Sequence, residues 1–193
     1  VLSDPAIYEY ENAPPQSLNG LRERLAELES RRSPNGREQW LNWVIRRPDS
    51  RLIGYVQATV HAGGRADVVF INSPASNRGH NGLNLVADNG STIAGAFTDG
   101  SFSQSGNAGA HVESTNNSNV GLTFTRTPIT NNGTTGFEYL VNGGSLLSAT
   151  FTDGNLSSNP TNNVVGTVDG AGSRAILDFT NTNANLLAAN GGF

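Results

Sequence analysis

The sequence repeats itself every 27 residues from about Gly79 onward, and this period constrains the fold more than any other feature. Stepping by 27 brings like residues into the same column several times. The matched columns are Gly79, Gly106 and Gly133; Gly82, Gly109 and Gly136; Phe97, Phe124 and Phe151; and Thr98, Thr125 and Thr152. A further repeat carries Phe179 and Thr180, displaced by one inserted residue. Such a period indicates structural units stacked along one axis.

Apolar and polar residues alternate over short runs within each repeat, as they do in a strand with one buried face. Turn-forming segments such as Asp88-Asn89-Gly90 and Asn142-Gly143-Gly144 separate the runs. The pattern predicts a mainly β protein, in which a parallel β-solenoid of about four coils spans residues 72–193. Each coil is expected to hold three short strands, which in the first coil lie near residues 82–87, 93–98 and 101–103.

Stacked coils would place equivalent residues about 4.8 Å apart. We therefore expect two structural ladders, an internal aromatic one of Phe97, Phe124 and Phe151 and an outward hydroxyl one of Thr98, Thr125 and Thr152. Charged residues on neighbouring rungs also fit this stacking, because Asp99, Arg126 and Asp153 alternate in sign and His111 falls over Glu138.

Residues 1–71 differ from the repeats and predict a small α/β segment, with one or two helices and three antiparallel strands, that could cap one end of the solenoid. Leucines at helical spacing indicate a helix within residues 15–32. Alternating runs then indicate three antiparallel strands, at 39–45, 52–61 and 66–71. Trp40 and Trp43 lie three apart in the first of these runs and should therefore point to opposite faces.

A resemblance to a known family rests on three segments of this first part, LSDPAIYEYENAPPQSLNGLRERL, WLNWVIRRPDSRLIGYVQATV and ADVVF. Their sequence resembles the GNAT N-acetyltransferases, particularly the branch that modifies ribosomal-protein or amino-acid N-termini. The resemblance implies a loop that binds the pyrophosphate of acetyl-CoA, for which Arg78, Gly79 and Gly82 are the candidates. The family's first strand and everything after its fourth are missing, so the resemblance implies an incomplete transferase segment. The 27-residue columns already account for Gly79 and Gly82.

The repeats, over about residues 75–193, resemble the right-handed parallel β-helix repeats of large bacterial secreted and surface proteins, with phrases such as NGG, FTDG and ITNNGTTGF. This resemblance implies a secreted or surface location for the solenoid, whereas an acetyltransferase would be cytoplasmic. Some β-helix enzymes cleave polysaccharides with clustered acids. Asp99 and Asp153 are the candidate pair here, although Arg126 lies between them.

Composition limits the other functions. A net charge of −4 gives no basic surface for nucleic acid, and no run is long enough to span a membrane. The sequence has no Cys, and the spacing of His61, His80 and His111 matches no metal-ligand motif, so neither metal nor cofactor is expected.

Three hypotheses follow from the sequence. The first is a non-catalytic solenoid scaffold or binding module for glycans or cell surfaces, which could also self-associate through the solenoid ends. The second is an acetyl-CoA-dependent N-acetyltransferase. The third is a polysaccharide-processing β-helix enzyme.

Overall fold

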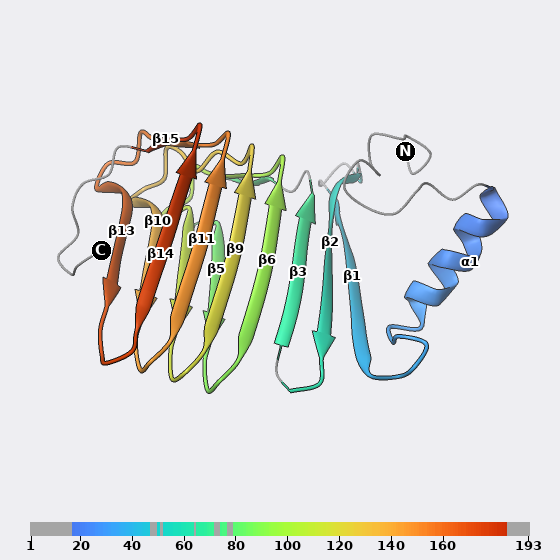
Figure 1. Ribbon diagram of the computed structural model, residues 1–193. Coiled ribbons are helices and arrows are strands. Elements are labelled where there is room, and N and C mark those ends of the chain that lie inside the picture. The colour runs from blue at the N-terminus through green and yellow to red at the C-terminus, as the bar shows by residue number, and fades with distance from the viewer. Residues whose placement is uncertain are drawn as a thin grey trace.

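A computed structural model describes residues 17–46, 50, 52–63, 65–71, 74–76 and 79–184 of the chain. Within these residues the protein is mainly β, with one helix, α1 (Leu18–Glu29). The expected parallel β-solenoid of about four coils is confirmed (Figure 1).

The larger of its two main sheets contains seven strands in the order β1-β2-β3-β6-β9-β11-β14. β1 and β2 pair antiparallel, as do β2 and β3, whereas every later pair in this sheet is parallel. The strands are β1 (Glu38–Arg46), β2 (Leu52–His61), β3 (Arg65–Ile71), β6 (Thr92–Thr98), β9 (Asn119–Thr125), β11 (Leu146–Thr152) and β14 (Arg174–Thr180).

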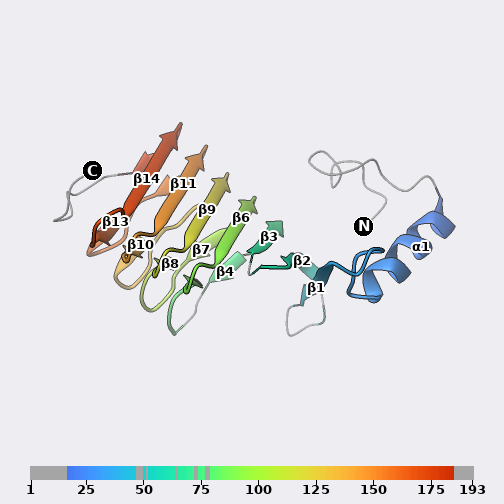
Figure 2. The same ribbon diagram turned by 60° about the horizontal axis from the view of Figure 1, so that its bottom comes forward.

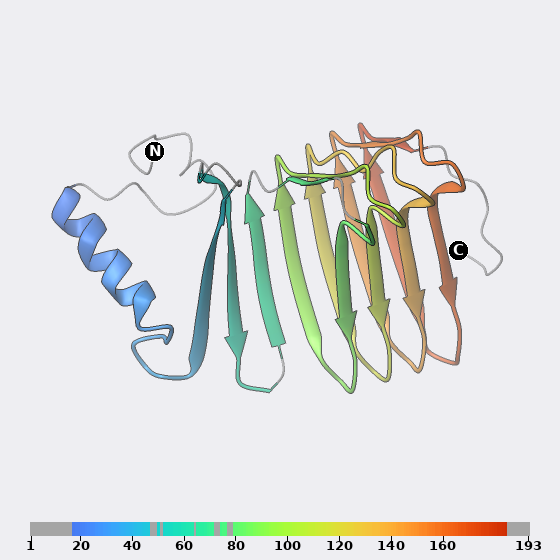
Figure 3. The ribbon, with the colours of Figure 1, turned by 180° about the vertical axis from the view of Figure 1, so that it is seen from behind.

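A second, four-stranded parallel sheet lies behind the first in the view of Figure 1 and in front of it in Figure 3. Its strands, in spatial order, are β13 (Asn162–Val168), β10 (Thr135–Val141), β8 (Ala110–Ser114) and β5 (Leu83–Ala87). A narrow third side joins the two sheets. The short strands of this third side are β4 (Pro74–Ser76), β7 (Ser101–Ser103), β12 (Asn155–Leu156) and β15 (Asn183–Ala184). Figure 2 shows the stacked coils obliquely.

The strand register follows the sequence period. Phe124 of β9 lies opposite Phe97 of β6 and Phe151 of β11, one sequence period away on each side. The next step in this row, from Phe151 to Phe179, is longer than the period by the inserted residue, as the sequence predicts. The strands β5, β6 and β7 fall close to the three ranges expected for the first coil.

Stacked phenylalanines fill the core. The rings of Phe97, Phe124 and Phe151 lie parallel, with centroids 4.8 Å apart at both steps, and each residue is 1% exposed. The column continues at both ends, to Phe70 at 4.8 Å and to Phe179 at 5.0 Å. A second buried column lines the third side of the coils, with members Phe102, Ile129 and Leu156.

Buried polar side chains also form ladders, and they satisfy backbone groups at the corners of the coils. The amide of Ser91 donates to Oγ of Ser118 at 3.2 Å, and the amide of Ser118 donates to Oγ of Ser145 at 3.0 Å. At another corner, the amide of Asn132 donates to Oδ1 of Asn159 at 3.0 Å. These side chains replace the water that a buried corner excludes.

Glycine is required where the corners of successive coils meet. A Cβ on Gly133 would collide with the carbonyl of Gly106 in the coil before it. A Cβ on Gly82 would lie 2.6 Å from the carbonyl oxygen of Gly109 and 2.8 Å from Oγ of Ser105. Close stacking therefore accounts for these two glycines.

The segment before the repeats is not confirmed as a separate α/β unit. β3 pairs parallel with β6, so β3 is the first strand of the parallel part of the large sheet. β1 and β2, which we call the wing, extend that sheet beyond the first coil, and α1 lies next to β1 (Figure 1). The division expected between residues 71 and 72 thus falls between two strands, β3 and β4, of a single coil.

Candidate functional site

A flat surface without charge covers the middle of the large sheet. The outward residues of β6, β9 and β11, which we call the Thr face, are all small apart from Asn119 and Leu146. No described element lies over this surface (Figure 1). Its members are Thr92, Ala94, Ala96 and Thr98 on β6; Asn119, Gly121, Thr123 and Thr125 on β9; and Leu146, Ser148, Thr150 and Thr152 on β11.

Threonine hydroxyls form two adjacent columns on the Thr face. One runs along the row of Thr98, Thr125 and Thr152 and continues to Thr180 on β14. The other pairs Thr123 with Thr150, two residues earlier on β9 and β11. Neighbouring hydroxyls are therefore about 4.8 Å apart between strands and about 6.7 Å apart along a strand. The first column was predictable from the sequence period, whereas the second was not, because only two of its positions are Thr.

A row of charged residues borders the Thr face at its turn side. Nε of Arg126 donates to Oδ1 of Asp99 at 2.7 Å, and Nη2 of Arg126 donates to Oδ2 of Asp99 at 2.9 Å. Asp153, on the next rung, accepts a hydrogen bond from Nδ2 of Asn181 at 3.2 Å. The guanidinium neutralises Asp99, so Asp99 and Asp153 do not form a pair of free carboxylates.

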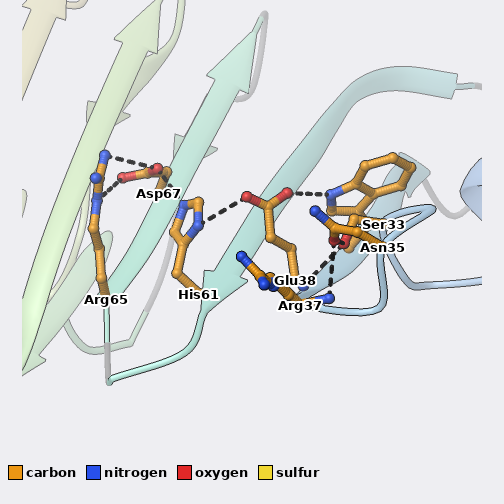
Figure 4. A network of polar contacts seen from close by, with 8 residues as sticks. Ser33, Asn35, Arg37, Glu38, His61, Arg65 and Asp67 are labelled. Atoms are coloured by element: carbon orange, nitrogen blue, oxygen red, sulfur yellow. Dashed lines mark hydrogen bonds and ion pairs between the residues drawn. The ribbon is translucent and has the colours of Figure 1, made fainter.

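A linear polar network crosses the outer side of the wing and β3 (Figure 4). Nδ1 of His61 lies 3.1 Å from Oε1 of Glu38, and Nε2 lies 2.7 Å from Oδ2 of Asp67. Arg65 donates to both oxygens of Asp67, at 3.1 and 3.0 Å. Each ring nitrogen of His61 thus faces a carboxylate from a neighbouring strand. The network links three strands and leaves no nitrogen free to act as a base.

Indole nitrogen also joins this network, since Nε1 of Trp40 donates to Oε2 of Glu38 at 3.2 Å. Trp40 lies on the same face of the sheet as Thr59 and Asp67, and so on the face that bears the threonines. Trp43 points to the other face and is 51% exposed. The two tryptophans therefore take opposite faces, as predicted, and neither is buried.

His111 repeats the same arrangement on the four-stranded sheet. Its Nδ1 lies 2.9 Å from Oε2 of Glu138, and its Nε2 lies 2.9 Å from Oε1 of Glu113. Burial lowers the pKa of His111, but the hydrogen bonds and charges of Glu113 and Glu138 outweigh it and raise the pKa above its ordinary value. Sequence spacing found the contact with Glu138 and missed Glu113.

Of the three residues proposed for acetyl-CoA binding, the structure describes Gly79 and Gly82. Arg78 lies outside the described residues. Gly82 faces the neighbouring coil at Gly109 and Ser105, whereas Gly79 and His80 are exposed at a corner. Among the residues that the structure describes, no group of three or more His, Cys, Asp or Glu side chains could hold a metal ion.

The described part of the chain contains no helix that is long and apolar enough to cross a membrane. Comparison with known protein families, with curated proteins and with solved structures found no match to this chain.

Proposed function

We propose that this protein is a non-catalytic β-solenoid binding module whose Thr face binds extended, neutral polysaccharides. The observation that carries the proposal is the regular array of hydroxyl groups on a flat surface that no described element covers. Solenoids commonly use such extended surfaces for binding.

The chemistry of the Thr face suits a repeating polar ligand. Each Thr offers one hydroxyl that can donate and accept, next to a methyl group that adds apolar contact. A single hydroxyl contributes little to binding, because water competes for it. An extended polysaccharide would meet several rungs at once, and the contacts would then add along the chain. The absence of charge on this face favours neutral sugars over uronates.

The described side chains support the two enzymatic hypotheses less than they support the binding module. Catalytic acids and bases need a proton-accepting atom that can reach the substrate. Asp99 is held by Arg126, and both nitrogens of His61 and of His111 face carboxylates. The contacts of Asp99, His61 and His111 instead hold neighbouring strands together.

Binding to insoluble polysaccharides tests the proposal. The protein should co-sediment with at least one neutral polymer, such as a β-glucan or a mannan, and soluble fragments of that polymer should release it. The double variant Thr123→Arg, Thr150→Arg places two bulky cations in the middle of the Thr face and should lower the bound fraction about tenfold. Both residues lie on the surface, so the variant should keep the circular dichroism spectrum of the parent.

A matched control carries the same change on the opposite sheet. Asn84 and Thr167 are exposed on β5 and β13, and the double variant Asn84→Arg, Thr167→Arg should bind like the parent. Equal loss of binding in both variants would show that charge alone matters, and the Thr face would not be the site. No binding of the parent protein to any neutral polymer would overturn the proposal.

Acetyl-CoA provides the test of the transferase hypothesis. Calorimetric titration should give no binding heat beyond dilution, because Gly82 is packed against the neighbouring coil and Gly79 is exposed. Micromolar binding would overturn the non-catalytic proposal and favour an acetyltransferase.

A further inference from the structure

The strand β14 forms the C-terminal edge of the large sheet within the described residues, and its outward side chains differ from those of the strands beside it. They read Arg174, Ile176 and Asp178, whereas the equivalent positions on β11 are Leu146, Ser148 and Thr150. A positive and a negative side chain therefore stand symmetrically on either side of an isoleucine that is 39% exposed.

Neither charge is neutralised within the described part of the chain. The ion pairs there involve His61, Arg65, His111 and Arg126, and none includes Arg174 or Asp178. Both side chains are exposed. The edge thus carries two complementary charges with no described partner on the same molecule.

The backbone of β14 fixes which groups face outward from the edge. The amide of Arg174 donates to Ser145, and the carbonyl of Thr180 accepts from Asp153, so the even-numbered residues bond toward β11. In a strand, alternate residues turn their N–H and C=O groups to opposite sides. Ala175, Leu177 and Phe179 therefore present these groups at the outer edge, where no described strand pairs with them.

We propose that β14 pairs antiparallel with β14 of a second copy of this chain, about a two-fold axis that passes beside Ile176. This register places Arg174 of each copy directly opposite Asp178 of the other copy. The two Ile176 side chains meet at the centre. Ala175 and Leu177 then face each other as hydrogen-bonded pairs, and the charged residues occupy the closer, non-hydrogen-bonded positions. The inference is independent of the proposed polysaccharide binding.

Charge complementarity selects this register over its neighbours. A shift that preserves the backbone pairing would place either Arg174 or Asp178 opposite Ile176, and would leave the other charge without its counterion. Opposite charges directly across two strands stabilise the pair, and like charges destabilise it. Charged residues on an edge strand can also keep an edge free. The symmetric order of opposite signs makes the strand complementary to itself and so favours pairing with a second copy.

Charge reversal tests the proposal in the full chain. Sedimentation velocity over a concentration series should show a dimer for the parent protein. Arg174→Asp and Asp178→Arg, each alone, put like charges opposite each other and should weaken dimerisation at least about tenfold. The double variant Arg174→Asp, Asp178→Arg restores opposite charges in the reverse order and should dimerise like the parent.

An equimolar mixture of the two single variants should form a heterodimer, because one carries only acids and the other only arginines at these positions. The exposed Asn84, on β5, supplies a control, and Asn84→Asp should dimerise like the parent. A monomeric parent protein overturns the proposal. Dimerisation that the single variants leave unchanged, or that the double variant does not restore, overturns it as well.

Discussion

Each interior residue of this protein has the equivalent residue of the next coil as its main neighbour, so single substitutions act on a column. Phe124 is the clearest case, because its ring is stacked between Phe97 and Phe151 and lies edge-on to Phe102 and Phe137. Truncation of one member removes contacts on both of its faces. The structure cannot close such a gap easily, since the strand spacing is fixed by backbone hydrogen bonds.

Phe124→Ala should therefore lower the free energy of unfolding by about 3–5 kcal/mol. Urea denaturation followed by circular dichroism measures this loss. Thr123→Ala, the neighbouring exposed position on the same strand, is the control and should change stability by less than about 0.5 kcal/mol. A loss below about 1 kcal/mol for Phe124→Ala would contradict its position in the core.

Two glycines of one column allow a matched test of coil stacking. Gly133→Ala forces a methyl group against the carbonyl of Gly106 and should destabilise the protein by about 1–3 kcal/mol. A Cβ on Gly79, two coils earlier, meets no atom within 4 Å, so Gly79→Ala should be nearly neutral. Thermal melting of the two variants separates these outcomes. Equal destabilisation would indicate that these glycines are needed for another reason.

At the scale of elements, side chains that bridge neighbouring strands link one coil to the next. His111 on β8 contacts Glu138 on β10, and it also contacts Glu113 on its own strand. On the large sheet, His61 joins β2 to β1 and β3 in the same manner. Each of these two histidines is held between carboxylates that come from more than one strand, so its contacts link neighbouring strands.

The raised pKa of His111 predicts how stability depends on pH. The protonated ring is favoured in the folded state, so its contribution is fully present below the ordinary value of 6.5 and is lost as the pH rises through the folded value. The parent protein should lose about 0.5–1 kcal/mol more than His111→Gln across this range, as expected for a partly exposed ion pair. Urea midpoints measured at a series of pH values test the difference.

His80→Gln is the control for this titration, because His80 is exposed. It should keep the pH dependence of the parent. If His111→Gln also kept that dependence, another group would be responsible for it.

The sequence period predicted the elements of the repeats well, because identical residues recur wherever identical coils stack. Phe97, Phe124 and Phe151 carried that signal, and so did the glycines at the corners. The coil that begins with β3 was harder to recognise. Phe70 lies one sequence period before Phe97 and stacks on it, but β3 has none of the corner glycines, and a family resemblance placed it in another domain.

Contacts within the wing could not be predicted from the sequence. The meeting of His61 with Glu38 and Asp67 depends on the register of two antiparallel pairs, and no repeat fixes that register. The Thr face was predictable only in part. Its first column consists of identical residues. The other positions of the surface are uncharged and mostly small, but the residue type differs from strand to strand.

At the scale of the whole molecule, the fold is a one-dimensional stack in which each coil contacts the coils before and after it. Stability in such a stack is approximately the sum of coil and interface contributions. One coil should therefore be removable, provided that the deletion keeps every later residue in its column. The register of β9 and β11 sets the length of that deletion at one sequence period.

Deletion of residues 123–149 joins Leu122 to Thr150, and Leu122 and Ala149 occupy equivalent inward positions on β9 and β11. The shortened protein should keep its β spectrum and a cooperative transition, with a lower urea midpoint because one coil interface is lost. Deletion of residues 123–148 removes one residue fewer and joins Leu122 to Ala149. Side chains alternate between the faces of a strand, so this junction turns Phe151 outward or forces a bulge, and the protein should unfold or melt broadly. Equal stability of the two deletions would contradict a fold held in register by its columns.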